Sequence, residues 1–328
     1  MRTKFNVKLD VIAAASLAVA VAAMNSVAQD YPTKAVRLVV PYVPAGATDI
    51  MARIIAARLG AALGQQFIVD NRGGGASIVG TDAVVRAAPD GYTMLLANIA
   101  LAANPSLFRK LPYDAERDLA PVALVAILPT LLVSHPSIPA RNVKQLIAFA
   151  KARPGEIYYG SAGNGSVNHL TMEVFRWMAG IDFVHVPYKG GAPAILDVMS
   201  GQLSLMFPTV VMANPHVKSG RLVALGISSM KRTSVLPDVP TVAEAGVPGF
   251  DVNELHILMV PARTPAAIID RLRAELVKAL QNPEVVERAK ELGAEPVGST
   301  PREAAAFLKN EIARWAKVSK EARIPLVD

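Results

Sequence analysis

The sequence of 328 residues contains no cysteine. This absence excludes disulfide bonds, thiol nucleophiles, thiolate metal sites and lipid attachment at a cysteine. The fold must therefore be held together by its apolar core, and hydrophobic residues make up 52% of the chain, which is enough for such a core. The length suits one large or two medium-sized α/β domains.

Long runs of like charge are also lacking. The formal net charge is +7, but no basic run is longer than Lys231-Arg232, and the basic residues do not alternate with aromatic ones. The pattern of a nucleic-acid-binding protein is therefore missing, and we expect no nucleic-acid partner. Scattered positive charge is typical of a solvated surface, where it also raises the local concentration of anionic ligands.

A long apolar stretch lies near the N-terminus, at residues 11–24. It follows a basic N-terminal segment and is itself followed by the small residues Ser26-Val27-Ala28. This order predicts a secretory signal peptide, residues 1–28, cleaved near Ala28. A membrane anchor is the alternative, but the stretch is shorter than the ~20 residues that span a bilayer. We therefore expect export to the periplasm.

Motifs of the common catalytic and cofactor-binding folds are absent as well. There is no Gly-x-Ser-x-Gly sequence and no phosphate-binding Gly-Lys-Ser or Gly-Lys-Thr, and the five histidines lack metal-ligand spacing. The glycine-rich segment 71–80 fails the dinucleotide fingerprint, because Ile78 stands where its third glycine would be. We interpret Gly73–Gly75 as a tight turn and expect no cofactor, no metal and no enzyme activity.

One enzymatic alternative stays open. Ser166 and His169 lie three residues apart at the expected start of a helix, so that their side chains can meet. Either Ser166 or Ser161 could then act with His169 in a periplasmic hydrolase. The competing interpretation is that Ser166 caps the helix and that His169 has only a supporting role.

Short apolar runs alternate with amphipathic stretches along most of the chain. Strands are expected at 36–42, 67–70, 92–98, 157–159, 183–186, 203–207 and 222–227. Helices are expected at 50–63, 77–86, 143–152, 167–179 and 192–200, with two more after Thr264-Pro265 and Thr300-Pro301. This alternation predicts an α/β fold in which helices cover parallel sheets.

Two turns of small residues, 44–48 and 160–166, each lie where an expected strand leads into a helix. Small residues let a ligand approach the backbone, and helix N-termini present unpaired N–H groups and the positive end of a dipole. Two such turns far apart in the sequence predict a small anion held between two lobes. Ordinary loop chemistry is the alternative for either turn taken alone.

Motifs throughout the chain resemble those of the substrate-binding receptors of tripartite tricarboxylate transporters, often called Bug receptors. The motifs are Tyr31-Pro32, Val40–Asp49, Asn71–Gly80, Pro89–Thr93, Leu111–Asp114, Gly160–Leu170, Val186–Gly190, Leu236–Thr241 and Gly293–Pro296. The resemblance extends from about residue 31 to about residue 324. It implies a two-lobed type II periplasmic-binding-protein fold of the α/β class, each lobe a mixed sheet flanked by helices. Lobe 1 would contain residues 29–129 and 253–328, and lobe 2 residues 130–252.

The same resemblance implies a function and a site. The protein would be a periplasmic solute-binding receptor that closes on a small organic carboxylate, or a related amide, and delivers it to the membrane permease subunits. The candidate ligand-binding residues are Tyr42, Ala45, Gly46, Thr48, Asn98, Ser161, Gly163, Asn164, Pro208, Thr209 and His256. A monomer is expected. A receptor that signals to a partner protein is the alternative output.

Three departures from the family pattern bear on the ligand. The first turn has Pro-Ala-Gly at 44–46 where Pro-Gly-Gly is commoner, so Ala45 restricts the backbone. Pro208-Thr209 stands where an aspartate is frequent, which makes an amino-acid ligand less expected. The segment 253–256, Asn-Glu-Leu-His, replaces a usually aromatic stretch, and it makes His256 a candidate wall residue. The competing interpretation is that His256 is a core histidine with its hydrogen bonds satisfied.

Overall fold

The computed structural model describes residues 31–327. The predicted signal peptide, 1–28, lies outside the described residues and stays a prediction. No helix within the described range combines the length and apolarity needed to cross a membrane.

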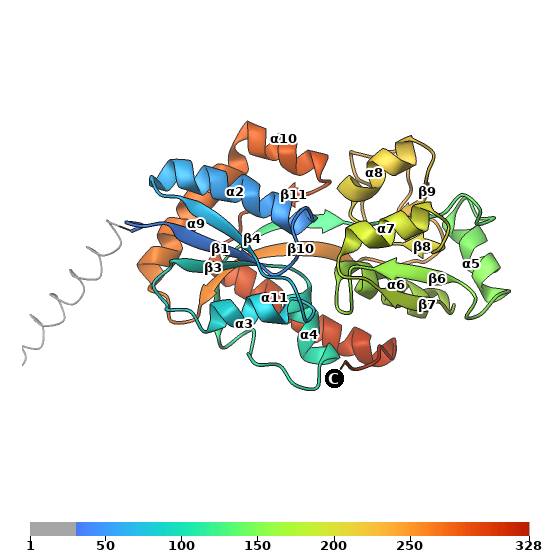
Figure 1. Cartoon of the computed structure of the whole chain (residues 1–328), viewed down its shortest axis with the longest axis horizontal. Coiled ribbons are helices and arrows are strands. Elements are labelled where there is room, and N and C mark those ends of the chain that lie inside the picture. The colour runs from blue at the N-terminus through green and yellow to red at the C-terminus, as the bar shows by residue number, and fades with distance from the viewer. Residues whose placement is uncertain (1–30, 328) are drawn as a thin grey trace, which may run out of the picture.

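A six-stranded mixed sheet forms the larger half of the molecule (Figure 1). Its strands are β1 (Val36–Val40), β2 (Phe67–Asn71), β3 (Thr93–Ala97), β4 (Leu119–Pro129), β10 (Asn253–Pro261) and β11 (Glu295–Pro296), in the order β11-β4-β10-β3-β1-β2. β1 runs parallel to β2 and β3, whereas β10 runs antiparallel to β3 and β4. The parallel pairs place the ends of β1 and β3, and the turns that follow them, at the same edge of the sheet.

A second mixed sheet of five strands lies beside the first. It contains β5 (Leu131–Ser134), β6 (Tyr158–Ser161), β7 (Val184–Pro187), β8 (Leu205–Met206) and β9 (Val223–Ile227), in the order β7-β6-β8-β5-β9. The chain enters this sheet after β4 and returns to the first sheet at β10. The predicted fold class, two mixed sheets flanked by helices, is confirmed. The lobe limits of 29–129, 130–252 and 253–328 stay a prediction.

Helices cover both faces of the first sheet (Figure 1). One face carries α2 (Ala47–Leu63), α9 (Ala266–Gln281) and α10 (Pro283–Glu291), and the other carries α3 (Ile78–Val85), α4 (Ala100–Leu107) and α11 (Pro301–Glu321). The α2 face buries an apolar cluster that includes Leu38, Met51 and Leu272. Such burial on both faces favours strands that are mostly apolar, and in β1, VRLVV, only the partly buried Arg37 is polar.

The second sheet is covered in the same way by α5 (Val143–Lys151), α6 (Val167–Ala179), α7 (Gly191–Met199) and α8 (Val210–Lys218). Residues of α7 and α8 share an apolar cluster with Leu131, Val133 and Met206. Residues of α5 and α6 belong instead to a core that continues to α4 and α11 of the first half. This shared core ties the two halves together beneath the cleft described below.

Several elements differ from the prediction. The strands β4, β5 and β10 and the helices α4 and α8 were not expected, and α2 begins at Ala47 rather than at residue 50. α4 and α8 each contain an internal proline, Pro105 and Pro215, which is a signal against a helix. Tertiary packing overrides that signal, since α4 lies in the core against α11. Ser166 and Thr300 cap their helices as expected. The cap expected at Thr264 is wrong, because α9 begins after Pro265 and the Thr264 hydroxyl donates to the Pro261 carbonyl instead.

Candidate functional site

Two adjoining cavities lie between the two halves of the molecule. The inner cavity, of about 80 Å³, is lined by Tyr42, Val43, Gly46, Ala47, Thr48, Asn98, Ala162, Ser166, Val167, Asn168, Gly190, Gly191, Thr209, Met212 and Glu254. The outer cleft, of about 550 Å³, shares Tyr42, Val43, Ala162, Ser166 and Gly190 with it and extends past Gly73–Ser77 and Gly163-Asn164 to Tyr188 and Lys189. Both halves of the chain therefore contribute walls to one continuous site.

The helices α2 and α6 both begin at the inner cavity. α2 starts after Gly46, which has extended backbone and no capping side chain, so the first N–H groups of that helix have no side-chain acceptor at the N-cap. α6 starts after Ser166, whose Oγ accepts the N–H of His169 at 3.4 Å. Two helix dipoles thus place their positive ends at one small cavity, an arrangement suited to an anion.

The first turn is held in place by Asp49. The Ala45 N–H donates to Asp49 Oδ2 at 3.0 Å, and the Asn71 side chain donates both to Asp49 Oδ1 at 3.0 Å and to the Tyr42 carbonyl at 3.1 Å. Arg53 pairs with the same carboxylate at 3.0 Å. Burial alone would raise the pKa of Asp49, but the hydrogen bonds from Arg53, the Ala45 N–H and Asn71 lower that pKa on balance. Asp49 is therefore a charged anchor for this turn.

The second turn rests on a row of buried and half-buried side chains. Ser161 Oγ lies 2.6 Å from His185 Nε2 and accepts the Gly163 N–H at 3.1 Å. His169 Nδ1 accepts the Gly165 N–H at 3.2 Å, and the His169 and His185 rings stack with centroids 4.3 Å apart. The pKa of His169 is lowered to about 3, chiefly by burial and also by His185 and Arg176. The pKa of His185 is lowered to about 4, chiefly by burial and also by Arg176. Both rings are neutral at pH 7.

The second turn also lies against the first half of the molecule. Gly165 has φ of 72°, and a Cβ there would lie 3.2 Å from Ala76 Cβ and from Asn104 Oδ1. Gly190 has φ of 122°, and a Cβ there would lie 3.1 Å from Val43 Cγ2. Glycine at these two positions is required both by the backbone conformation and by the close approach of the two walls.

The catalytic pairs of the hydrolase alternative are not formed. Ser166 Oγ donates to the Gly163 carbonyl at 2.6 Å and caps α6, while the ring of His169 accepts a backbone N–H. Ser161 pairs with His185, not with His169, and its side chain is fully buried. The Ser–His169 pair of this alternative is not formed because the α6 cap holds both side chains against the backbone, and the competing interpretation of Ser166 as a helix cap is confirmed.

The structure brings seven of the eleven predicted site residues to the two cavities. Tyr42, Gly46, Thr48, Asn98 and Thr209 line the inner cavity, and Gly163 and Asn164 line the outer cleft. The other four, Ala45, Ser161, Pro208 and His256, line neither. Ala45 is exposed, with φ of 70°, on the outside of the turn. The remaining three are buried and bond to other parts of the protein. The Pro208 carbonyl, for instance, accepts the N–H of Leu131.

Glu254 is the functional candidate that sequence reasoning missed. It is only 3% exposed, it lines the inner cavity, and its Oε1 has no hydrogen-bond partner among the described residues. Burial raises the pKa of Glu254 to about 8, against the opposing influence of the Ile99 and Leu255 N–H groups and of Asn98. An acidic residue within the largely buried β10 strand was the available signal.

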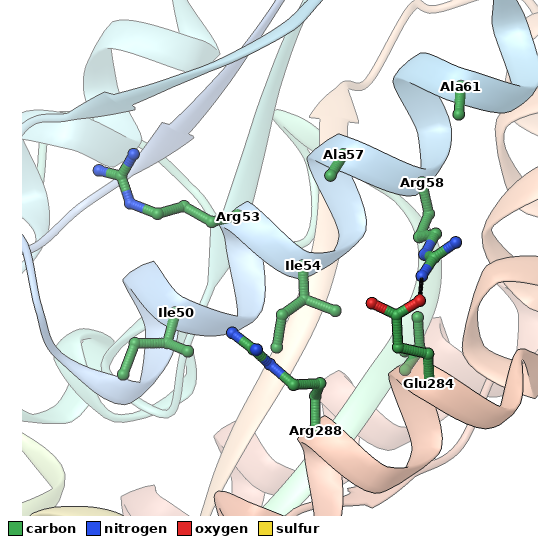
Figure 2. Close-up of a pocket in the computed structure, with 9 residues that line it drawn as sticks. Ile50, Arg53, Ile54, Ala57, Arg58, Ala61, Glu284 and Arg288 are labelled. Atoms are coloured by element: carbon green, nitrogen blue, oxygen red, sulfur yellow. Dashed lines mark hydrogen bonds and ion pairs between the residues drawn. The ribbon is translucent and has the colours of Figure 1, made fainter.

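A further open groove, of about 540 Å³, lies elsewhere, between α2 and α10. Figure 2 shows that Arg58 reaches across it to Glu284, whereas Arg53 points away from α10. Ile50, Ile54 and Ala57 form its apolar part. No residue of the second half lines this groove, so it is separate from the cavities between the lobes.

The arrangement of two lobes around a cleft agrees with what known proteins show. The sequence profile described as "Tripartite tricarboxylate transporter family receptor" matches residues 51–324. The chain belongs to this receptor family. The receptor is 39% identical over 296 residues to the protein BugT of Bordetella pertussis, covering 90% of this chain and 91% of BugT. The predicted resemblance is thereby confirmed.

Solved structures with the same fold include two that hold ligands. Rpa4515 of R. palustris, solved with adipate, has a TM-score of 0.87 and 36% identity and covers 90% of the receptor and all of its own chain. MatC from Rhodopseudomonas palustris, solved with bound malate, has a TM-score of 0.82 and 32% identity, with 88% and 99% covered. The periplasmic binding protein BugD has a TM-score of 0.85 and 33% identity, with 90% and 100% covered. The receptor is thus a relative of periplasmic binding proteins.

Proposed function

We propose that the receptor captures a small organic carboxylate between its two lobes in the periplasm and delivers it to the permease of a tripartite tricarboxylate transporter. The observation that carries the proposal is the convergence of the α2 and α6 N-termini on one cavity. Backbone N–H groups and helix dipoles can hold a carboxylate without an arginine or lysine.

The sizes of the two cavities support a ligand with one buried end and one outer end. The inner cavity, of about 80 Å³, has room for a carboxylate group and little more. The outer cleft has room for the rest of an aliphatic chain, and Lys189 and Asn164 there are exposed groups that can meet a second polar end. The adipate of Rpa4515 and the malate of MatC are ligands of this general shape.

A role in binding rather than catalysis also accords with the chemistry of the cleft. Ser161, which is buried, pairs with the half-buried His185, and neither residue lines the two cavities. Permease delivery, the cleaved signal peptide and a monomeric state are part of the proposal. The family membership supports the permease as partner.

The test is a thermal-shift screen of the exported, processed receptor against adipate, malate, succinate, citrate, the diamide of adipate, amino acids and neutral diols. A ligand at about 100 times its dissociation constant adds about 2.7 kcal/mol to stability, a shift of several degrees. We expect a carboxylate to give that shift. A panel in which only neutral compounds or amino acids raise the midpoint would contradict the proposal.

A pair of variants locates the site. Ala162 lines both cavities, so Ala162→Phe should fill the space and abolish the ligand-induced shift. Ala192, which is exposed on α7, provides the matched control, and Ala192→Phe should keep the shift. Retention of binding in Ala162→Phe would show that the ligand binds elsewhere.

A further inference from the structure

Glu254 occupies an unusual position for a protein that captures anions. Its carboxyl group lies at the wall of the inner cavity, on the same face of β10 as His256, whose Nε2 lies 3.2 Å from Thr48 Oγ1. Glu254 is 3% exposed, and its Oε1 is buried without a partner. Thr209 Oγ1, across the cavity, is likewise buried and without a partner among the described residues. Two residues of the cavity wall thus have hydrogen-bonding capacity that no described residue uses.

No cation offsets the acid at this place. Among the described residues that line the inner cavity, none is Lys, Arg or His. Arg53 is engaged with Asp49 on the outer side of α2, and Lys189 lines only the outer cleft. An ionised Glu254 and a ligand carboxylate would therefore share one small, water-poor cavity, where like charges repel strongly.

We propose that Glu254 meets the ligand as a neutral carboxylic acid, whose O–H group donates a hydrogen bond to an anionic oxygen of the bound carboxylate. This inference rests on the proposed function and deepens it. It identifies the ligand group that the inner cavity selects as a carboxylate oxygen, which accepts hydrogen bonds. The acid then adds a donor to those of the two helix N-termini.

The environment of Glu254 favours its neutral form. Burial raises the pKa of Glu254 to about 8, and a ligand anion beside it would favour the protonated form further. Below that pH the receptor already holds the proton. Above it, each binding event takes up one proton from solvent, so affinity must fall as pH rises.

The other titratable groups around the cavity do not change charge between pH 7 and pH 9. Burial raises the pKa of Tyr42, which stays neutral. Burial lowers the pKa of His256 and of His169 to about 3, so both rings are already neutral. Hydrogen bonds lower the pKa of Asp49, which stays paired with Arg53. The variant Lys189→Met measures how far Lys189, at the outer cleft, contributes to the pH dependence of binding.

Calorimetric titration of the processed receptor with adipate and with malate at pH 7, 8 and 9 tests the inference. Both probes are dianions throughout this range. We expect the dissociation constant to rise about tenfold between pH 7 and pH 9 for the wild type and for Lys189→Met. In Glu254→Gln, which keeps a neutral N–H donor, the dissociation constant should not change with pH. The matched control is Glu291→Gln at an exposed site of α10, which should behave as the wild type.

Each result that contradicts these expectations has its own meaning. Binding that is independent of pH in the wild type, or a slope that persists in Glu254→Gln, would overturn this inference and leave the proposed function intact. A slope that disappears in Lys189→Met would assign the proton to Lys189. Absence of binding by every carboxylate at every pH would overturn the proposed function itself.

Discussion

Thr48 Oγ1 and His256 Nε2 lie 3.2 Å apart and join the first turn of α2 to β10 across 208 positions of the sequence. His256 is fully buried, and its Nδ1 has no partner among the described residues. The imidazole lines neither cavity and supports the inner one through its contact with Thr48. This contact couples the N-terminal end of α2 to the strand that carries Glu254.

The receptor should lose stability as the pH falls below about 6.5. Burial lowers the pKa of His169, His185 and His256 to about 3, 4 and 3. Neutral histidines of this kind contribute stability above the ordinary histidine pKa, and that stability is lost as the pH falls toward the folded-state values. Thermal midpoints measured from pH 7.5 to pH 4.5 check this expectation.

His256→Gln should flatten part of this acid limb, because the amide can replace the bond to Thr48 and does not titrate. His135→Gln is the control, since His135 lies apart from the cavities and bonds to Ser137. If both variants lost stability between pH 7 and pH 5 as steeply as the wild type, the burial of His256 would not be the cause.

Glu254 should act on stability with the opposite sign. Its folded-state pKa, about 8, is raised by burial above the ordinary glutamate value of 4.5. The stability that it contributes is complete below pH 4.5 and is lost as the pH rises toward 8. Glu254→Gln should therefore raise the midpoint of the ligand-free receptor at pH 8 by at least a few degrees, since about 1 kcal/mol moves it by roughly 2–4 °C. The gain should vanish near pH 4.5, and a constant gain at both pH values would contradict the titration.

Asp49→Asn should weaken both the first turn and ligand capture. The substitution removes the ion pair with Arg53 and one acceptor of the network that holds Ala45 and Asn71. Hydrogen bonds to charged groups contribute about 1.5–3 kcal/mol each, so a loss of stability on the order of 2 kcal/mol is expected. Denaturant unfolding and carboxylate titration measure the two effects. Asp238→Asn, at an exposed position, should change neither.

Glycine substitution should have opposite effects at two alanines close together in sequence. Ala45 has φ of 70°, a conformation that costs an L-residue roughly 1–2 kcal/mol and glycine very little. After the greater entropy of unfolded glycine is subtracted, Ala45→Gly should be neutral or stabilise by up to about 1 kcal/mol. Ala57→Gly, in the exposed interior of α2, should instead destabilise by about 1 kcal/mol. Equal losses at both positions would mean that Ala45 carries no strain.

Local signals account for what was predicted correctly. The cap at Ser166 and the capping box of Thr300 and Glu303 depend on residues three apart, and the structure contains both. The turns that form the cleft follow from small residues placed between a strand and a helix. Glu254 and the Ser161–His185 pair were missed because their surroundings come from other strands. His185, for example, reaches Ser161 only because β6 and β7 pair in parallel.

The sequence by itself determined the α/β class, the two small-residue turns and the lack of thiol chemistry, because each depends on composition or on neighbouring residues. The tertiary structure decided which residues line the cavities. It turned His256 behind the wall, buried Ser161 beneath its turn and brought Glu254 to the inner cavity. The reason is physical: burial and hydrogen bonding depend on which strands and helices become neighbours. Those neighbours, such as Thr48 and His256, can lie 208 positions apart in the chain.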